Sequence, residues 1–126
     1  MKITVEWSEA EHIATIFHED VRIATMEDIA EWKGQVFPPL VEIAMRTGKK
    51  PLVVVCIDGV SIDPAVADEY GKGAKYIAEQ LSAGLARYGS AARVRSLIAK
   101  EAIKKGYKAN LFETRDEARR HVLVRA

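Results

Sequence analysis

The residues best placed to do chemistry follow an aliphatic run that ends at Ile57. Asp58, Ser61 and Asp63 come directly after it, where a loop joins a strand to the next helix. In open α/β sheets, ligands bind beyond the carboxyl ends of strands, where helix N-termini point outward. Two carboxylates that converged in a cleft could also do acid–base chemistry. In the simpler interpretation, Asp63 is only a helix N-cap and Asp58 a turn residue.

Tyr70 and Lys72 extend this candidate surface along the helix that should follow. Tyrosine is favoured at interfaces because it combines contact area with a polar tip. Residues 71–75 have the look of a phosphate loop, but a Walker loop ends in Gly-Lys-Ser/Thr, and here Ala74 follows Gly73. Glycines inside a helix cost about 1 kcal/mol each, which indicates close packing, a helix break or an approach surface. The predicted binding surface is therefore Asp58, Ser61, Asp63, Tyr70 and Lys72.

Histidine and cysteine do not form a recognisable reactive site in this sequence. His12 and His18 would lie about 20 Å apart along one strand, too far to share a metal ion. Cys56 is expected inside a buried aliphatic strand, whereas reactive cysteines occupy exposed electropositive sites. No Gly-x-Ser-x-Gly elbow orders a catalytic triad. We therefore expect no metal, no cofactor and no catalytic residue.

Length and charge narrow the class of protein. The 126 residues fit one domain spanning 1–126, and 19 basic against 18 acidic residues give a net charge of +1. That balance gives no global attraction for nucleic acid or an anionic membrane. The basic residues of the second half are interpreted as a solvated helix face, because few aromatic residues interleave with them. One cysteine, no apolar leader and no membrane span predict a cytoplasmic protein.

The elements that must position these residues begin with a hairpin. Residues 2–7 alternate between apolar and polar, and residues 12–18 follow as an antiparallel strand. Residues 21–23 either extend this hairpin or form a loop. The run 52–57 does not alternate, which suits a central strand covered on both faces. Two further strands are expected, at residues 85–89 and 107–112.

Four helices are expected among these strands. The first begins at the N-cap Thr25 and ends at Gly48, with an interruption or kink at Pro38-Pro39, because proline lacks the amide donor. The other three are expected to begin at Asp63, Ser90 and Thr114, the last with a capping box. Strands that alternate with helices predict a mostly parallel sheet, with an antiparallel strand of the hairpin at one edge.

Three stretches together suggest a family. They are the helix and strand of residues 25–57, the loop Asp-Gly-Val-Ser-Ile-Asp at 58–63, and Leu-Phe-Glu-Thr-Arg-Asp-Glu-Ala at 111–118. The arrangement resembles the STAS family, the domain of sulphate transporters and anti-sigma-factor antagonists, and particularly its SpoIIAA-like bacterial relatives. In that family a strand ends in Val-Ser-x-x-Asp-Ser-Ser-Gly, and the last element begins Phe-x-x-x-x-Glu-Ala. The resemblance implies an α/β fold with a mixed sheet, the hairpin at its edge, and helices packed mainly on one face.

The resemblance also implies a regulatory or binding domain without cofactor or catalysis. In anti-sigma-factor antagonists a serine directly after the loop aspartate is phosphorylated, whereas here Pro64-Ala65 follows Asp63, which argues against that switch. We expect a protein partner at residues 58–72. Two alternatives stay open: a carrier of a small apolar molecule or lipid, and an enzyme that uses Asp58 with Asp63. Homodimerisation through an edge strand or an exposed helix face also stays open.

Overall fold

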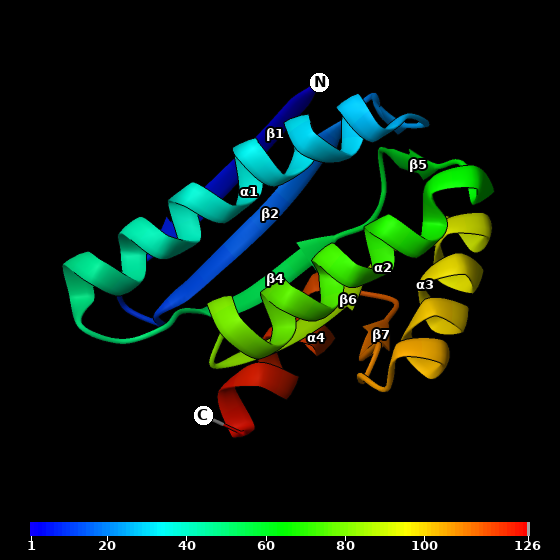
Figure 1. Cartoon of the computed structure of the whole chain (residues 1–126). Helices are drawn as coiled ribbons and strands as arrows, with labels where there is room; N and C mark the ends of the chain where they lie inside the picture. The colour runs from blue at the N-terminus through cyan, green and yellow to red at the C-terminus, as the bar shows by residue number, and fades with distance from the viewer. Residues whose placement is uncertain (126) are drawn as a thin grey trace.

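The computed structural model describes residues 1–125 and contains a five-stranded mixed sheet of order β1-β2-β4-β6-β7 (Figure 1). β1 pairs antiparallel with β2, and the other neighbours pair in parallel. The strands are β1 (Lys2–Ser8), β2 (Ile13–Glu19), β4 (Leu52–Cys56), β6 (Gly84–Tyr88) and β7 (Leu111–Phe112). The predicted α/β fold with the N-terminal hairpin at one edge of a mixed sheet is therefore confirmed.

A second, two-stranded ladder answers the question left open over residues 21–23. β3 (Val21–Ile23) pairs in parallel with β5 (Val60–Ile62), so these residues neither extend the hairpin nor form a loop. Gly59, with φ of +83°, makes this pairing possible. A Cβ there would lie 2.3 Å from the carbonyl oxygen of His18, so only glycine allows the loop after β4 to approach β2.

The helices cover both faces of the sheet unequally. They are α1 (Met26–Thr47), α2 (Ala67–Tyr76), α3 (Ala92–Lys105) and α4 (Arg115–Val124). The strand order from β2 to β7 never reverses, so crossovers of one hand place α1, α2 and α3 on the same side. α4 lies on the other face, where Ala118 and Val122 pack against Leu52, Val54 and Ala86 (Figure 1).

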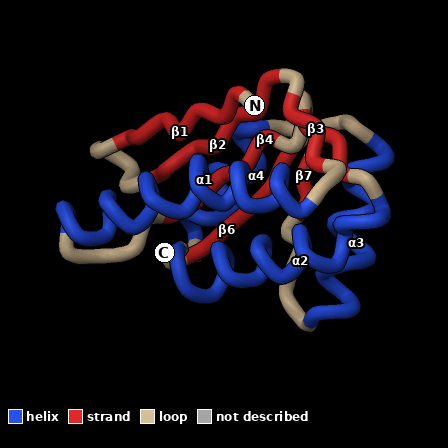
Figure 2. Tube along the Cα trace, turned by 45° about the horizontal axis from the view of Figure 1, so that its top comes forward, coloured by secondary structure: helices blue, strands red, loops and turns tan. Residues whose placement is uncertain are grey.

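This winding affects where a ligand can bind. Doubly wound sheets open a crevice where the strand order reverses, and the described sheet has no such reversal. α2 and α3 instead lie side by side at the β7 end of the sheet (Figure 1 and Figure 2). A surface site is therefore formed between helices rather than in a sheet crevice.

α1 is not interrupted at Pro38-Pro39 and runs from Met26 to Thr47. Pro38 lacks the amide that would donate to the carbonyl of Gly34. Both residues are exposed, so water can bind that carbonyl oxygen. A buried stripe continues on both sides of the prolines and holds the helix on the sheet: Ile29, Trp32, Val36, Leu40 and Ile43. Packing therefore outweighs the missing hydrogen bonds.

Other boundaries differ from the expectation in smaller ways. The second helical segment begins as a 3₁₀ turn at Pro64–Val66 and ends as a π turn at Ile77–Leu81. The last strand covers only Leu111–Phe112, because Asn110 takes a left-handed backbone with φ of +49°. Cys56 ends β4 half-buried rather than buried, which corrects the expectation for that thiol.

Candidate functional site

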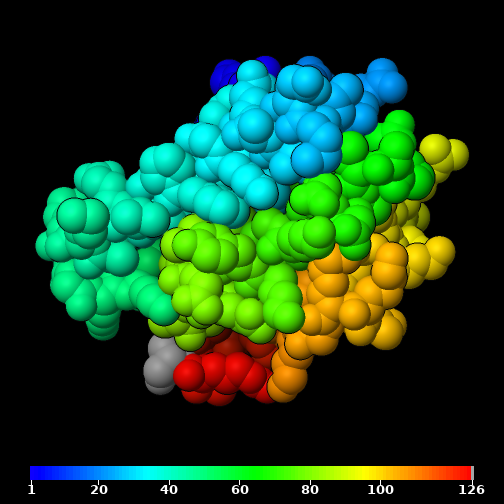
Figure 3. Space-filling view, in the orientation of Figure 1, coloured from blue at the N-terminus to red at the C-terminus, as the bar shows by residue number. Residues whose placement is uncertain are grey.

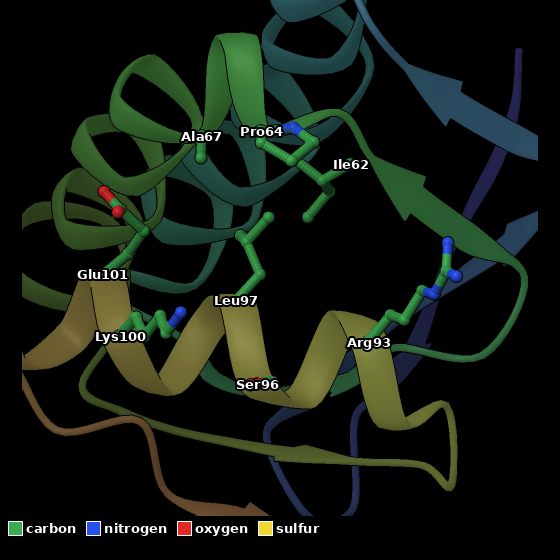
Figure 4. A pocket seen from close by; sticks show the side chains of 8 residues that line it. All are labelled: Ile62, Pro64, Ala67, Arg93, Ser96, Leu97, Lys100 and Glu101. Atoms are coloured by element: carbon green, nitrogen blue, oxygen red, sulfur yellow. The ribbon is translucent and has the colours of Figure 1, made fainter.

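A surface groove of about 480 Å³ lies between the start of the second helical segment and α3. Figure 3 places these two segments, green and yellow to orange, next to each other on the surface. In Figure 4, Leu97 points from α3 toward Ile62 and Ala67 across the hollow. The floor of the groove is therefore apolar. Two exposed cations, Arg93 and Lys100, belong to its α3 wall.

The sequence of α3 explains how it presents two different faces. Arg93, Leu97 and Lys100 are spaced four and three residues apart, so they share one face of the helix. The alternate stripe of Val94 and Ile98 is buried in the main hydrophobic core. The helix therefore anchors through one stripe and leaves the other to line the groove.

Glycines in α2 allow the helices to approach closely. A Cβ on Gly71 would lie 2.8 Å from Oε1 of Glu101 on α3, and one on Gly73 would lie 2.5 Å from Cζ3 of Trp32 on α1. Of the three explanations for glycines inside this helix, the structure supports close packing. Gly71 therefore allows α2 to pack closely against α3 beside the groove.

The electrostatics of the groove are positive. Its one acidic residue, Glu101, is only 4% exposed and is bound by Lys105 and, at 3.5 Å, by Lys104. Lys105 also reaches Asp68 at 2.8 Å, and this hydrogen bond lowers the pKa of Asp68. Arg93 and Lys100 make no ion pair with any residue of 1–125. Their two charges are therefore available to a partner.

The predicted aspartates stabilise the chain around the groove and do not line it. Asp63 Oδ1 accepts a hydrogen bond from the Ala65 amide at 2.9 Å, as an N-cap does. Asp58 Oδ1 accepts from the amides of Ser90 at 3.0 Å and Ala91 at 3.3 Å. It thereby stabilises the start of α3 in place of the Ser90 side chain, which the sequence had suggested. Asp63 is thus an N-cap, and Asp58 binds the two backbone amides that directly precede α3.

The other three predicted residues lie apart from one another. Ser61 is exposed on β5, and Lys72 is exposed and paired with Asp68 and Glu69. Tyr70 is only 4% exposed, and its burial raises its pKa to about 12. Its placement on an exposed surface is therefore corrected: the inner face of α2 carries Tyr70 against Trp32, with ring centroids 4.7 Å apart.

Histidine and cysteine side chains lie away from the groove. His18 Nδ1 is 2.8 Å from the carbonyl oxygen of Cys56, and burial lowers the pKa of His18. Within residues 1–125, no three or more His, Cys, Asp or Glu side chains are grouped in a way that would hold a metal ion. No helix in the same range combines the length and the apolar character that crossing a membrane requires.

Comparisons with protein-family models, with curated proteins and with solved structures found no match. The fold and the groove therefore define the protein at the level of a mixed α/β domain with a cationic, apolar-floored groove between two helices.

Proposed function

We propose that this chain is a non-catalytic binding or regulatory domain that receives a partner protein in the groove between α2 and α3. One observation carries the proposal: an apolar floor around Leu97 lies beside two cations, Arg93 and Lys100, that no residue of 1–125 neutralises. Protein interfaces combine an apolar centre with a polar rim. The complementary partner is a segment that carries apolar side chains flanked by acidic ones.

A STAS-type, SpoIIAA-like assignment belongs to the same proposal. It is supported by the hairpin at the edge of a mixed sheet and by three helices on one face. The end of β5 and the following 3₁₀ turn also border the groove, through Ile62 and Pro64. Because Pro64-Ala65 follows Asp63, the proposal includes no phosphorylation switch at that point.

The structure favours a protein partner over the two alternatives. A carrier of a lipid or small molecule encloses its ligand in a pocket of about 300–1,000 Å³. The 480 Å³ groove is open to solvent. Two other cavities are more enclosed, but they measure only about 30 and 20 Å³, too small for such a ligand. An enzyme that used Asp58 with Asp63 would need both in a cleft, but each binds backbone amides and neither lines the groove.

Quantitative affinity capture from native extract tests the proposal. Lys100→Glu reverses a groove charge, and Lys108→Glu is the matched control, since Lys108 is equally a surface lysine and lies outside the groove. We expect Lys100→Glu to lose most of the captured partner, more so at low salt, and Lys108→Glu to retain it. Equal capture by both variants would contradict the groove as the binding surface.

A further inference from the structure

Arg87 on β6 is a buried cation without a carboxylate partner in residues 1–125. Arg87 is 2% exposed, and its guanidinium donates one hydrogen bond, from Nη1 to the carbonyl of Ala109 at 2.8 Å. The guanidinium carbon also lies 5.6 Å from the ring centroid of Tyr107. Arginine stays charged in proteins and carries five N–H donors. The charge of Arg87 therefore has no carboxylate partner among the residues described and is compensated only by one carbonyl and one aromatic ring.

The neighbouring buried acid does not neutralise Arg87. Glu101 is 4% exposed, and its carboxylate oxygens are bound by Lys104 and Lys105. Lys105 carries a second carboxylate contact, to Asp68. A buried charge is stable when it is paired or coordinated, because the desolvation cost of an isolated ion is large. An anion beside Arg87 would therefore supply the counter-charge that no carboxylate of residues 1–125 gives.

A small cavity adjoins this arginine. It measures about 20 Å³ and is lined by Arg87, His18 and Tyr70 among apolar side chains such as Trp32 and Val55. That space holds one particle the size of a water molecule and excludes a polyatomic anion such as phosphate. Tyr70 adds a hydroxyl donor that stays protonated, since burial raises its pKa to about 12.

We infer that this cavity binds a single monatomic anion, chloride, held by the guanidinium of Arg87 with Tyr70 at its side. Chloride supplies the missing charge in the available volume, whereas a water molecule fills the space and leaves the arginine uncompensated. The site lies inside the core between β6 and α2. It is separate from the groove, so the inference does not rest on the proposed function.

Thermal unfolding at constant ionic strength tests the inference, with chloride exchanged for gluconate. In the wild type we expect Tm to rise with the logarithm of the chloride concentration once that exceeds Kd, and chloride at about nine times its Kd multiplies the folding equilibrium constant about tenfold. Arg87→Met keeps an extended apolar side chain but removes the charge, and should abolish the rise. Asn110→Gly is the matched control, because Asn110 follows Ala109 in the loop before β7 and has a positive φ that glycine tolerates. The substitution removes the 2.9 Å hydrogen bond from the Asn110 side chain to the Leu85 carbonyl and keeps Arg87.

Crystals grown in sodium bromide keep the inference falsifiable if Arg87→Met fails to fold. An anomalous difference peak in the cavity beside Arg87 is the expected result. A water molecule in that cavity without any anomalous signal would overturn the inference. So would a wild type that does not respond to chloride, or an equal response from wild type and Arg87→Met.

Discussion

Asp58 should stabilise α3 although about thirty residues separate the two in the chain. The first amides of a helix have no partner within it, and Ala91, the N-cap residue of α3, offers no side-chain acceptor. Asp58 Oδ1 accepts hydrogen bonds from the amides of Ser90 and Ala91 at 3.0 and 3.3 Å. Asp58→Ala would leave these two amides to water and remove a negative charge from the helix N-terminus.

The expected loss follows from measured capping energies. Replacing a capping side chain by alanine costs about 0.5–2 kcal/mol, and a carboxylate near a helix N-terminus adds about 0.3–1 kcal/mol. Because Asp58 is exposed, water recovers part of this energy. We therefore expect Asp58→Ala to lower the free energy of unfolding by about 1 kcal/mol, which for a domain of this size lowers Tm by about 3–5 °C.

Urea unfolding of three variants separates this account from the sequence-based one. Asp58→Asn keeps an acceptor and should retain most of the stability. Ser90→Ala should change the free energy of unfolding by less than about 0.5 kcal/mol, since the Ser90 hydroxyl does not cap α3. A larger loss in Ser90→Ala than in Asp58→Ala would refute the reasoning.

Two further predictions concern packing and pH. Gly34→Ala should raise the free energy of unfolding by about 0.5–1 kcal/mol, because a Cβ there meets open space on an exposed helix face. Gly73→Ala should lower the free energy of unfolding by about 1–3 kcal/mol, because its Cβ would lie 2.5 Å from Trp32. Urea unfolding of the two variants checks these values, and equal effects would contradict the close packing of α2 on α1. Burial lowers the pKa of His18, so its contribution to stability is present above the unfolded-state pKa of about 6.5 and is lost as pH falls through the folded-state pKa. An NMR titration should therefore place the His18 midpoint below 6.5, and a midpoint at or above that value would contradict its burial.

The parts of the fold that depend on local chemistry could be predicted from the sequence. The alternation of residues 2–7 and the caps at Thr25 and Thr114 each involve groups a few residues apart, and all three agree with the structure. The β3–β5 ladder could not be predicted in this way. Its strands are three residues long, too short for a period, and depend on the approach of Gly59 to His18.

The site was harder to predict because it depends on how helices pack. The spacing of Arg93, Leu97 and Lys100 is visible in the sequence, but the opposite wall of the groove comes from residues 62–67, which only the packing of α2 against α3 brings close. Tyr70 was expected at the surface because an amphipathic side chain suits either environment, and only the packing against Trp32 decides between them.

Photo-cross-linking from inside the groove tests the central claim most directly. A photoreactive residue at Ser96, exposed on the α3 wall, is compared with the same residue at Gln80, which is exposed outside the groove. We expect Ser96 to cross-link in native extract to a segment with apolar and acidic residues, and Lys100→Glu to remove this product. A partner that cross-links from Gln80 but not from Ser96, or a Ser96 product unaffected by Lys100→Glu, would contradict it.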